Sequence, residues 1–439
     1  MRHYIAPMAK LTSTALNFRL VLLGALAFFC AQVLAQPAES YGKRFVRDGA
    51  SWPAEAVPEP QQISTRSDPG TAERLRERLE ELELQSGPYA ASLSEPLSDL
   101  ARALDATGRY EEAAQQRGRA LHLLRINEGL YSPTQVPLLQ DQLAADRRRG
   151  DFEALDARYN YYFRLFGNAL PPYTSLRFAA TMEYFRWQRE ALRRGLDGSP
   201  FNRLDDLLRI GDELLQRLEE SEPPVEPALL RDATLNQLRN YFLFADLVQP
   251  SQDLEPWRVA NPAAARNMVD FDPMRDRLEQ RRRGLRARGD ALLGDLLERM
   301  PAVDAAALDR ALLLRERGDW ALWWGSVQTA RQWYQSSWEV LVGAGHEAVA
   351  ERWFAEATPL PDNGVFLDPA AAVAGVARVQ LTVDERGSAQ ALLVDSRDDL
   401  PRDVRRLPEL IRKTRFRPSL VHGQAVPWSS DSWRFVAYD

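Results

Sequence analysis

A repeat of 42 residues constrains this chain more than any other feature of its sequence. When residues 87–170 are aligned with themselves at that offset, glycine, aromatic and leucine positions coincide. The coinciding pairs are Gly87 and Gly129, Tyr89 and Tyr131, Leu97 and Leu139, Gly108 and Gly150, and Tyr110 and Phe152. A repeat of this length predicts a unit that cannot bury its own apolar face, so neighbouring units have to stack.

Each repeat holds two stretches of helical periodicity with a glycine between them. In the first copy, leucines recur at helical spacing up to Gly108, and Tyr110 begins a second apolar stripe. The pattern predicts a helical hairpin with Leu104 in the first copy and Leu143 in the second copy buried between helices. Because helices commonly end at a glycine in the left-handed region, Gly108 and Gly150 should have positive φ just beyond the first helices.

The repeat-defining residues are Gly108, Tyr110, Gly150 and Phe152, and in the first copy Ala113 follows the aromatic residue by three. This pattern resembles the tetratricopeptide repeats of kinesin light chains. The resemblance implies a helical solenoid with an extended concave groove that binds a protein partner. The region of tetratricopeptide-like repeats covers residues 72–170. Further helices are expected in an irregular repeat region, 171–358, at 174–194, 202–220, 227–248, 273–299 and 304–317.

The first 35 residues differ in kind from the rest. Three cations precede the apolar run LVLLGALAFFCAQVLA, which ends with the small residues Val33 and Ala35. This arrangement predicts a cleaved signal peptide and a periplasmic protein. The alternative is an inner-membrane anchor facing the periplasm, but a membrane span needs about 20 apolar residues and this run is shorter. Residues 36–71 have no apolar periodicity and are rich in proline, which predicts a linker.

Composition excludes several kinds of chemistry. The single cysteine, Cys30, lies in the predicted signal peptide, so the mature chain should have no disulfide and no thiolate site. A formal net charge of −6, more negative after signal removal, disfavours nucleic acid as a partner. His122, His346 and His422 lack the spacing of a zinc site. No catalytic, cofactor or metal residue is assigned, although a pair of catalytic carboxylates stays open.

Residues 366–439 predict a small α+β domain with the order strand, strand, helix, strand. Alternating apolar residues at 377–383, the turn at 384–387 and the stretch 389–393 indicate a β-hairpin. A helix is expected at 407–414 and a last strand at 431–438. The motif residues Val383, Asp384, Gly387, Arg415, Phe416, Pro418 and Gly423 resemble the C-terminal domain of the TonB energy-transducer family. That resemblance implies partner binding by strand addition.

Two groups of residues are candidate contacts for a partner. In the tryptophan-rich segment, Trp323 and Trp324 are expected on a groove wall, since six tryptophans exceed what one hairpin can bury. At the last strand, which should form an open sheet edge, Trp433, Arg434, Phe435 and Val436 are expected to pair with a peptide. The alternative is that this edge is docked on the solenoid, with Trp428 and Trp433 packed into the interface. An arginine run at 281–288 is expected to be a solvated face paired with neighbouring acids.

The sequence therefore predicts a mainly α fold, in which a helical-hairpin solenoid is followed by a small α+β domain. The expected function is a non-catalytic, exported scaffold of the cell envelope that binds a protein or peptide, with no cofactor and no membrane-spanning segment in the mature chain. The alternatives are a peptidoglycan hydrolase and a component of TonB-type energy transduction. The sequence does not identify the partner or the oligomeric state.

Overall fold

The structure is a computed structural model, and it describes residues 41–50, 70–197, 200–248, 273–300, 306–367, 373–395 and 406–438. Helices dominate these ranges, and a small group of strands follows near the C-terminus, so the fold is mainly α with a small α+β part, as predicted. The predicted signal peptide lies outside the described residues. No helix within them combines the length and apolar composition that a bilayer crossing requires.

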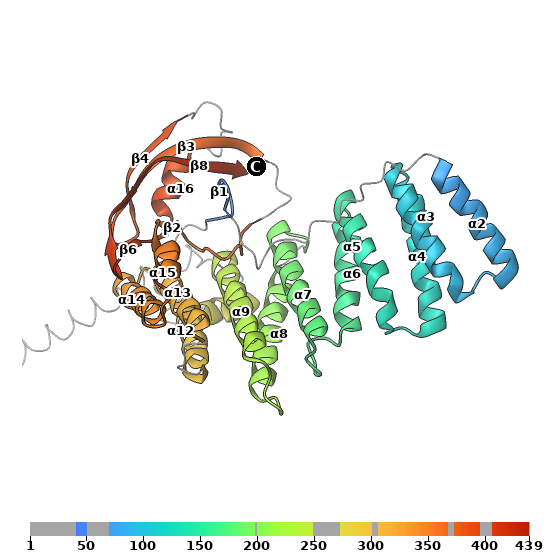
Figure 1. Ribbon diagram of the computed structural model, residues 1–439, viewed down its shortest axis with the longest axis horizontal. Helices are drawn as coiled ribbons and strands as arrows, with labels where there is room; N and C mark the ends of the chain where they lie inside the picture. Colours follow the sequence, from blue (N-terminus) through green and yellow to red (C-terminus); the bar gives the residue numbers. More distant parts are fainter. Residues whose placement is uncertain are drawn as a thin grey trace, which may run out of the picture. The chain divides into compact units, whose positions relative to one another are not determined.

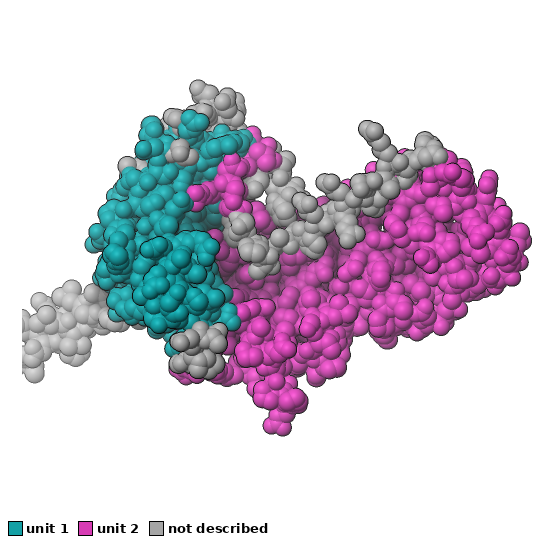
Figure 2. Space-filling model, in the orientation of Figure 1, with its two compact units in different colours: residues 1–41, 302–361, 375–435 teal, residues 42–301, 362–374, 436–439 magenta. Residues whose placement is uncertain are grey.

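The chain divides into two compact units, coloured separately in Figure 2. The repeat unit comprises residues 42–301, 362–374 and 436–439, and the C-terminal unit comprises residues 1–41, 302–361 and 375–435. The last helices of the chain therefore group with the strands that follow them. The sequence instead placed a domain boundary between those helices and the strands.

The repeat unit consists of helices that stand side by side as successive hairpins (Figure 1). They are α2 (Gly70–Ser86), α3 (Ser94–Ala106), α4 (Tyr110–Glu128), α5 (Val136–Arg149), α6 (Phe152–Leu165), α7 (Ser175–Arg194), α8 (Phe201–Glu219), α9 (Pro227–Leu247) and α12 (Pro273–Arg299). Two 3₁₀ turns, η1 (Ala91–Leu93) and η2 (Pro133–Gln135), lead into α3 and α5. The helices predicted between 174 and 299 begin and end within one residue of the expected positions.

Glycines end the first helix of each clear repeat. Gly150 follows α5 directly with φ 69°, and Gly108 lies two residues beyond α3 with φ 78°. Both values are in the left-handed region, where a side chain would be strained. Leu104 is fully buried and Leu143 is 5% exposed, which confirms both as core residues. The periodicity thus predicted the hairpin and its packing correctly.

The C-terminal unit begins with three helices, α13 (Ala307–Trp323), α14 (Val327–Gly343) and α15 (Glu347–Phe354). The sequence predicted that the first of these helices ends at residue 317, but α13 continues through Gly318. Gly318 is needed for packing, because an added Cβ would lie 2.4 Å from the ring of Tyr334 in α14. The glycine therefore marks close approach of two helices and not the end of one.

Strands and a short helix complete the molecule. They are β1 (Phe45–Arg47), β2 (Thr358–Pro359), β3 (Val373–Val383), β4 (Ala389–Asp395), α16 (Leu407–Lys413), β5 (Phe416–Arg417), β6 (Ser419–Val421), β7 (Gln424–Val426) and β8 (Trp428–Tyr438). β3 and β4 form the predicted antiparallel hairpin, with Val379 opposite Val394. β2 pairs with β5, and β6 pairs with β7. The sequence did not predict the strands β1, β2, β5, β6 and β7.

The largest sheet has the strand order β1–β8–β3–β4. β8 therefore has a neighbour on each side, and the prediction that the last strand forms an open edge is wrong. The strand next to β8 at one end of the order is β1, which comes from a stretch that the sequence predicted to be linker. Phe45 and Val46 in this strand are 1% and 5% exposed. A short strand of three residues in a proline-rich stretch gives no recognisable alternation.

A buried ion pair lies inside the C-terminal unit. The guanidinium group of Arg417 in β5 donates to both carboxylate oxygens of Asp319 in α13, with 2.9 Å from Nε to Oδ1. Tyr334 donates its hydroxyl to Oδ1 of the same carboxylate at 2.9 Å. All three residues are at most 3% exposed. Burial, followed by the nearby charge of Asp319, raises the pKa of Tyr334 well above its usual value, so the phenol stays a donor.

Candidate functional site

The first helices of successive hairpins, α3, α5 and α7, are joined by polar side chains. Three ion pairs cross between them: Arg102 with Asp141 (3.6 Å), Arg148 with Asp105 (3.1 Å) and Arg147 with Glu190 (2.6 Å). We call the surface formed by these helices the first-helix face. Each pair joins one repeat to the next, so the pairs hold the spacing and orientation of the helices that present this face.

The pair at Glu190 is the most deeply buried of the three. Arg147 donates to both of its carboxylate oxygens, and Arg186 and Arg194 also donate to it. Burial alone would raise the pKa of this carboxyl group, but the hydrogen bond and charge of Arg147 outweigh burial and lower it to about 2. Glu190 is therefore ionised at any physiological pH and fixes three arginines around one point.

Several polar side chains of the first-helix face remain open to solvent. Glu95 and Arg102 on α3, and Gln140 and Arg148 on α5, are all exposed. Glu95 offers a hydrogen-bond acceptor, Arg102 and Arg148 offer donors, and Gln140 offers both. Such a surface can hydrogen-bond a polar or charged peptide segment, and its mixed charge favours selectivity over indiscriminate attraction.

Trp323 and Trp324 do not line a surface. They are 1% and 5% exposed, and with Trp320 they form a cluster whose ring centroids lie 5.3 to 5.9 Å apart. The prediction that they lie on a groove wall is therefore wrong, because both indoles are buried against Trp320 and against each other. Among the six tryptophans of this segment, those that stay partly exposed are Trp333, Trp338 and Trp353.

The four residues expected to pair with a peptide lie in β8. Trp433 and Phe435 are 4% and 0% exposed and face the interior, whereas Arg434 is exposed and Val436 is half-buried. Since β8 has a neighbour on both sides, its backbone does not offer a free edge for strand addition. The alternation along the strand was predicted correctly, but its position in the sheet was not.

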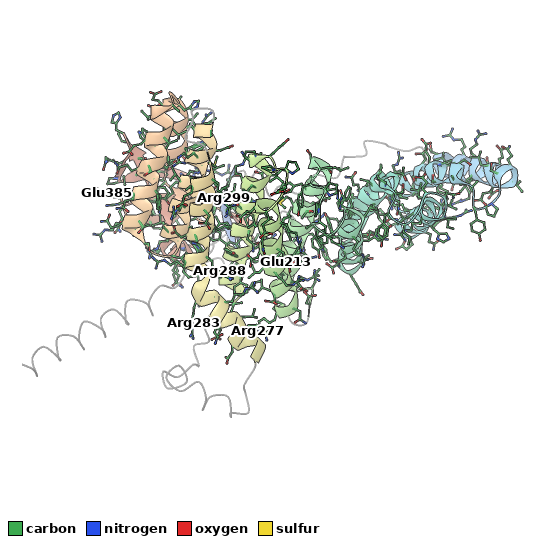
Figure 3. The ribbon with its side chains drawn as sticks, turned by 90° about the horizontal axis from the view of Figure 1, so that it is seen from below. Glu213, Arg277, Arg283, Arg288, Arg299 and Glu385 are labelled. Atoms are coloured by element: carbon green, nitrogen blue, oxygen red, sulfur yellow. The ribbon has the colours of Figure 1, made fainter. Side chains whose placement is uncertain are left out.

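Two arginines of the predicted arginine run contact neighbouring helices. Arg281 contacts Asp205 and Asp212 of α8, and Arg282 donates to the carbonyl oxygen of Ala245 in α9. These arginines therefore fix α12 against its neighbours. Four arginines placed along α12 are labelled in Figure 3: Arg277, Arg283, Arg288 and Arg299. Of these, Arg299 contacts Glu219 of α8 at 3.2 Å.

The repeat-defining aromatics begin the second helices. Tyr110 opens α4 and is 43% exposed, and Phe152 opens α6 with the guanidinium carbon of Arg194 4.2 Å from its ring centroid. His122 in α4 and His422 in the turn between β6 and β7 are exposed, and His346, just before α15, is half-buried. Within the described ranges, no group of histidine, cysteine, aspartate and glutamate side chains could hold a metal ion.

Sequence reasoning did not find the ion pairs of the first-helix face. Arginines and acids are abundant throughout the chain, so their partners cannot be identified without the helix packing. One regularity is visible in the sequence. Asp105 and Asp146 each lie near the end of a first helix, and each pairs with an arginine of the second helix of the same hairpin. Those arginines are Arg117 and Arg158, which are separated by nearly one repeat.

No protein-family model matches this chain, and no curated protein matches its sequence.

Proposed function

We propose that this chain is a non-catalytic scaffold of the cell envelope, exported by the N-terminal signal sequence, that binds a protein or peptide through the first-helix face. The observation that carries this proposal is the set of ion pairs between consecutive first helices. They hold α3, α5 and α7 in a fixed order and leave a row of exposed polar groups on two of them.

A fixed row of this kind suits the recognition of another chain. The side chains that would contact the partner already have their positions, so little conformational entropy is lost when it binds. The resemblance of the repeats to tetratricopeptide repeats favours the same function. Strand addition at β8 is not part of the proposal, because that strand lies inside the sheet.

Photo-crosslinking in the native envelope tests the proposal. A photoreactive phenylalanine at Gln140 should give a discrete adduct, whereas the same group at Gln216, an exposed residue of the second helix α8, should not. Charge reversal at the exposed residues Arg102 and Arg148 should abolish the Gln140 adduct without changing export. Equal labelling from both positions would contradict a specific partner on this face.

Zymography on peptidoglycan separates the scaffold from the hydrolase alternative. The purified chain should leave the substrate gel unchanged. A cleared band that disappears when one carboxylate of the first-helix face is replaced by its amide would establish the hydrolase and reject the scaffold.

A further inference from the structure

The helices α7 and α9 of the repeat unit are covered where α5 is open to solvent. Every residue from 184 to 192 in α7 and from 240 to 245 in α9 is at most 8% exposed. Because both stretches exceed one helical turn, the two helices are covered on every side there. In α5, by contrast, Gln140 and Arg148 are exposed. The cover of α7 and α9 includes residues 362–367, between β2 and β3, which we call the connector.

Arginines of both helices hold the main chain of the connector. Arg193 in α7 donates to the carbonyl oxygen of Val365, and Arg239 in α9 donates to the carbonyl oxygen of Asn363 at 3.2 Å. Val365 and Phe366 are 0% and 2% exposed. The connector is thus fixed to two helices through its carbonyl oxygens, while two adjacent apolar side chains are buried.

The connector folds on itself as a tight turn. The amide of Val365 donates to the side-chain oxygen of Asn363 at 3.2 Å, and the amide of Leu367 donates to the carbonyl oxygen of Gly364 at 3.0 Å. Val365 and Phe366 stand at the tip of this turn. Because both hydrogen bonds lie within the connector, the turn can keep its shape away from the helices, and little ordering is needed when it docks.

The arginine that holds the connector on α7 has an exposed counterpart on α5. Arg193 and Arg148 each lie two residues before the glycine that follows their helix, Gly195 and Gly150, whose φ angles are 64° and 69°. Arg148 is exposed and contacts Asp105 of α3 at 3.1 Å. The same position of a first helix is therefore occupied by the connector on α7 and open on α5.

The contacts select the shape of a turn and an apolar tip. Main-chain carbonyl oxygens are present in every peptide, so Arg193 and Arg239 can hold any turn whose carbonyl oxygens have this spacing. The buried positions of Val365 and Phe366 add a requirement for two adjacent apolar side chains, because a polar side chain would be buried there at a cost. The two helices thus have the properties of a binding site for a turn of this kind.

We infer that α7 and α9 form a peptide-binding site, which the connector fills in the isolated chain. Its external ligand is a partner turn with two adjacent apolar residues at the tip, and this turn binds by replacing the connector. The connector is tethered beside the site at a roughly millimolar effective concentration, so weak ligands are kept out. Its release breaks no helix or strand, since residues 362–367 lie between β2 and β3. The site is separate from the exposed groups of α3 and α5 in the proposed function.

Fluorescence anisotropy with a labelled peptide of residues 361–368 tests the site. The variant Val365→Asp with Phe366→Asp cannot bury its own connector, so it should bind the peptide at least about 100-fold more tightly than wild type does. The same peptide with aspartate at both apolar positions should bind neither chain. Equal affinity of the two chains would contradict the inference. So would a variant that keeps the wild-type circular dichroism spectrum and binds no peptide.

Arginine substitutions locate the peptide on the two helices. When Arg193→Gln and Arg239→Gln are added to the variant with aspartate at 365 and 366, peptide binding should weaken at least about tenfold, because two charged donors to carbonyl oxygens are lost. Arg148→Gln, at the equivalent exposed position of α5, is the matched control and should leave the affinity unchanged. A loss of binding in the Arg148 variant but not in the other would place the peptide on α5 and reject the site on α7 and α9.

A measurement on wild type alone decides the matter if the variant with aspartate at 365 and 366 does not fold. The peptide at about 1 mM, near the effective concentration of the connector, should compete for the site. With a photoreactive phenylalanine in place of Phe366, it should label α7 or α9, and replacing Val365 of the peptide by aspartate should prevent this. Labelling elsewhere, or none, would overturn the inference. The crosslinks expected from Gln140 are a separate result that neither outcome affects.

Discussion

Single side chains carry a large share of the stability of the repeats. Leu104 is fully buried in α3, in the core cluster that also takes in residues of α2 and α4. Leu104→Ala should lower the free energy of unfolding by roughly 2 to 4 kcal/mol, from lost apolar transfer and from the cavity left behind. Denaturant unfolding measures the change. Leu176→Ala, at a site 56% exposed, should change it by less than about 0.5 kcal/mol.

Glu190 makes the stability of the repeat unit depend on pH. Its pKa is lowered to about 2 in the folded state from 4.5, so the carboxylate stabilises the fold above 4.5 and loses that effect as the pH falls through 2. The shift corresponds to roughly 3 kcal/mol. Melting temperatures from pH 2 to 6 should show wild type well above Glu190→Gln at pH 6, with the difference closing at low pH. A constant difference would contradict the shift.

The buried pair of Arg417 and Asp319 should be strongly coupled. Arg417→Met leaves a buried carboxylate without its cation, which should cost roughly 3 to 5 kcal/mol. Adding Asp319→Asn removes the charge and keeps an acceptor for the Tyr334 hydroxyl, so the double variant should be more stable than Arg417→Met alone. A double-mutant cycle by thermal unfolding measures this coupling. Additive losses would show that the two groups act independently.

Turns between elements differ in how much they depend on glycine. Gly108 and Gly387 have similar positive φ angles, 78° and 75°. A Cβ at Gly108 would have no neighbour within 4 Å, whereas one at Gly387 would lie 2.0 Å from the carbonyl oxygen of Phe416 in β5. Gly108→Ala should therefore cost about 1 to 2 kcal/mol from backbone strain alone. Gly387→Ala should cost more and should weaken the contact with β5, which amide exchange at Phe416 measures.

Helices could be predicted from the sequence because their signals are local. The glycines at 108 and 150 and the leucine periodicity fixed the hairpins, and the alternation at 377–383 fixed β3. The errors concern contacts between distant segments. Nothing near β8 indicates that β1, in residues 45–47, is next to it in the sheet order, and nothing near Trp323 shows that two other indoles cover it. The ion pairs of the first-helix face were missed for the same reason.

At the scale of the whole molecule, the C-terminal strands and the helices α13 to α15 form one unit. Ser419 in β6 donates to the backbone of Phe354 in α15, and Arg417 is bound to α13. A fragment of residues 302–439 should therefore unfold cooperatively. A fragment of residues 362–439 should lack a cooperative transition, since it leaves Arg417 without Asp319. Circular dichroism on heating distinguishes the two, and a cooperative transition in the shorter fragment would contradict the shared core.

The same ion pair has a consequence for the synthesis of the chain. Asp319 leaves the ribosome 98 residues before Arg417 does, so α13 carries a carboxylate destined for the interior well before its cation exists. A chain interrupted in that interval cannot form this pair and so cannot close the C-terminal unit. Such a product should be cleaved by proteases faster than a chain that includes Arg417.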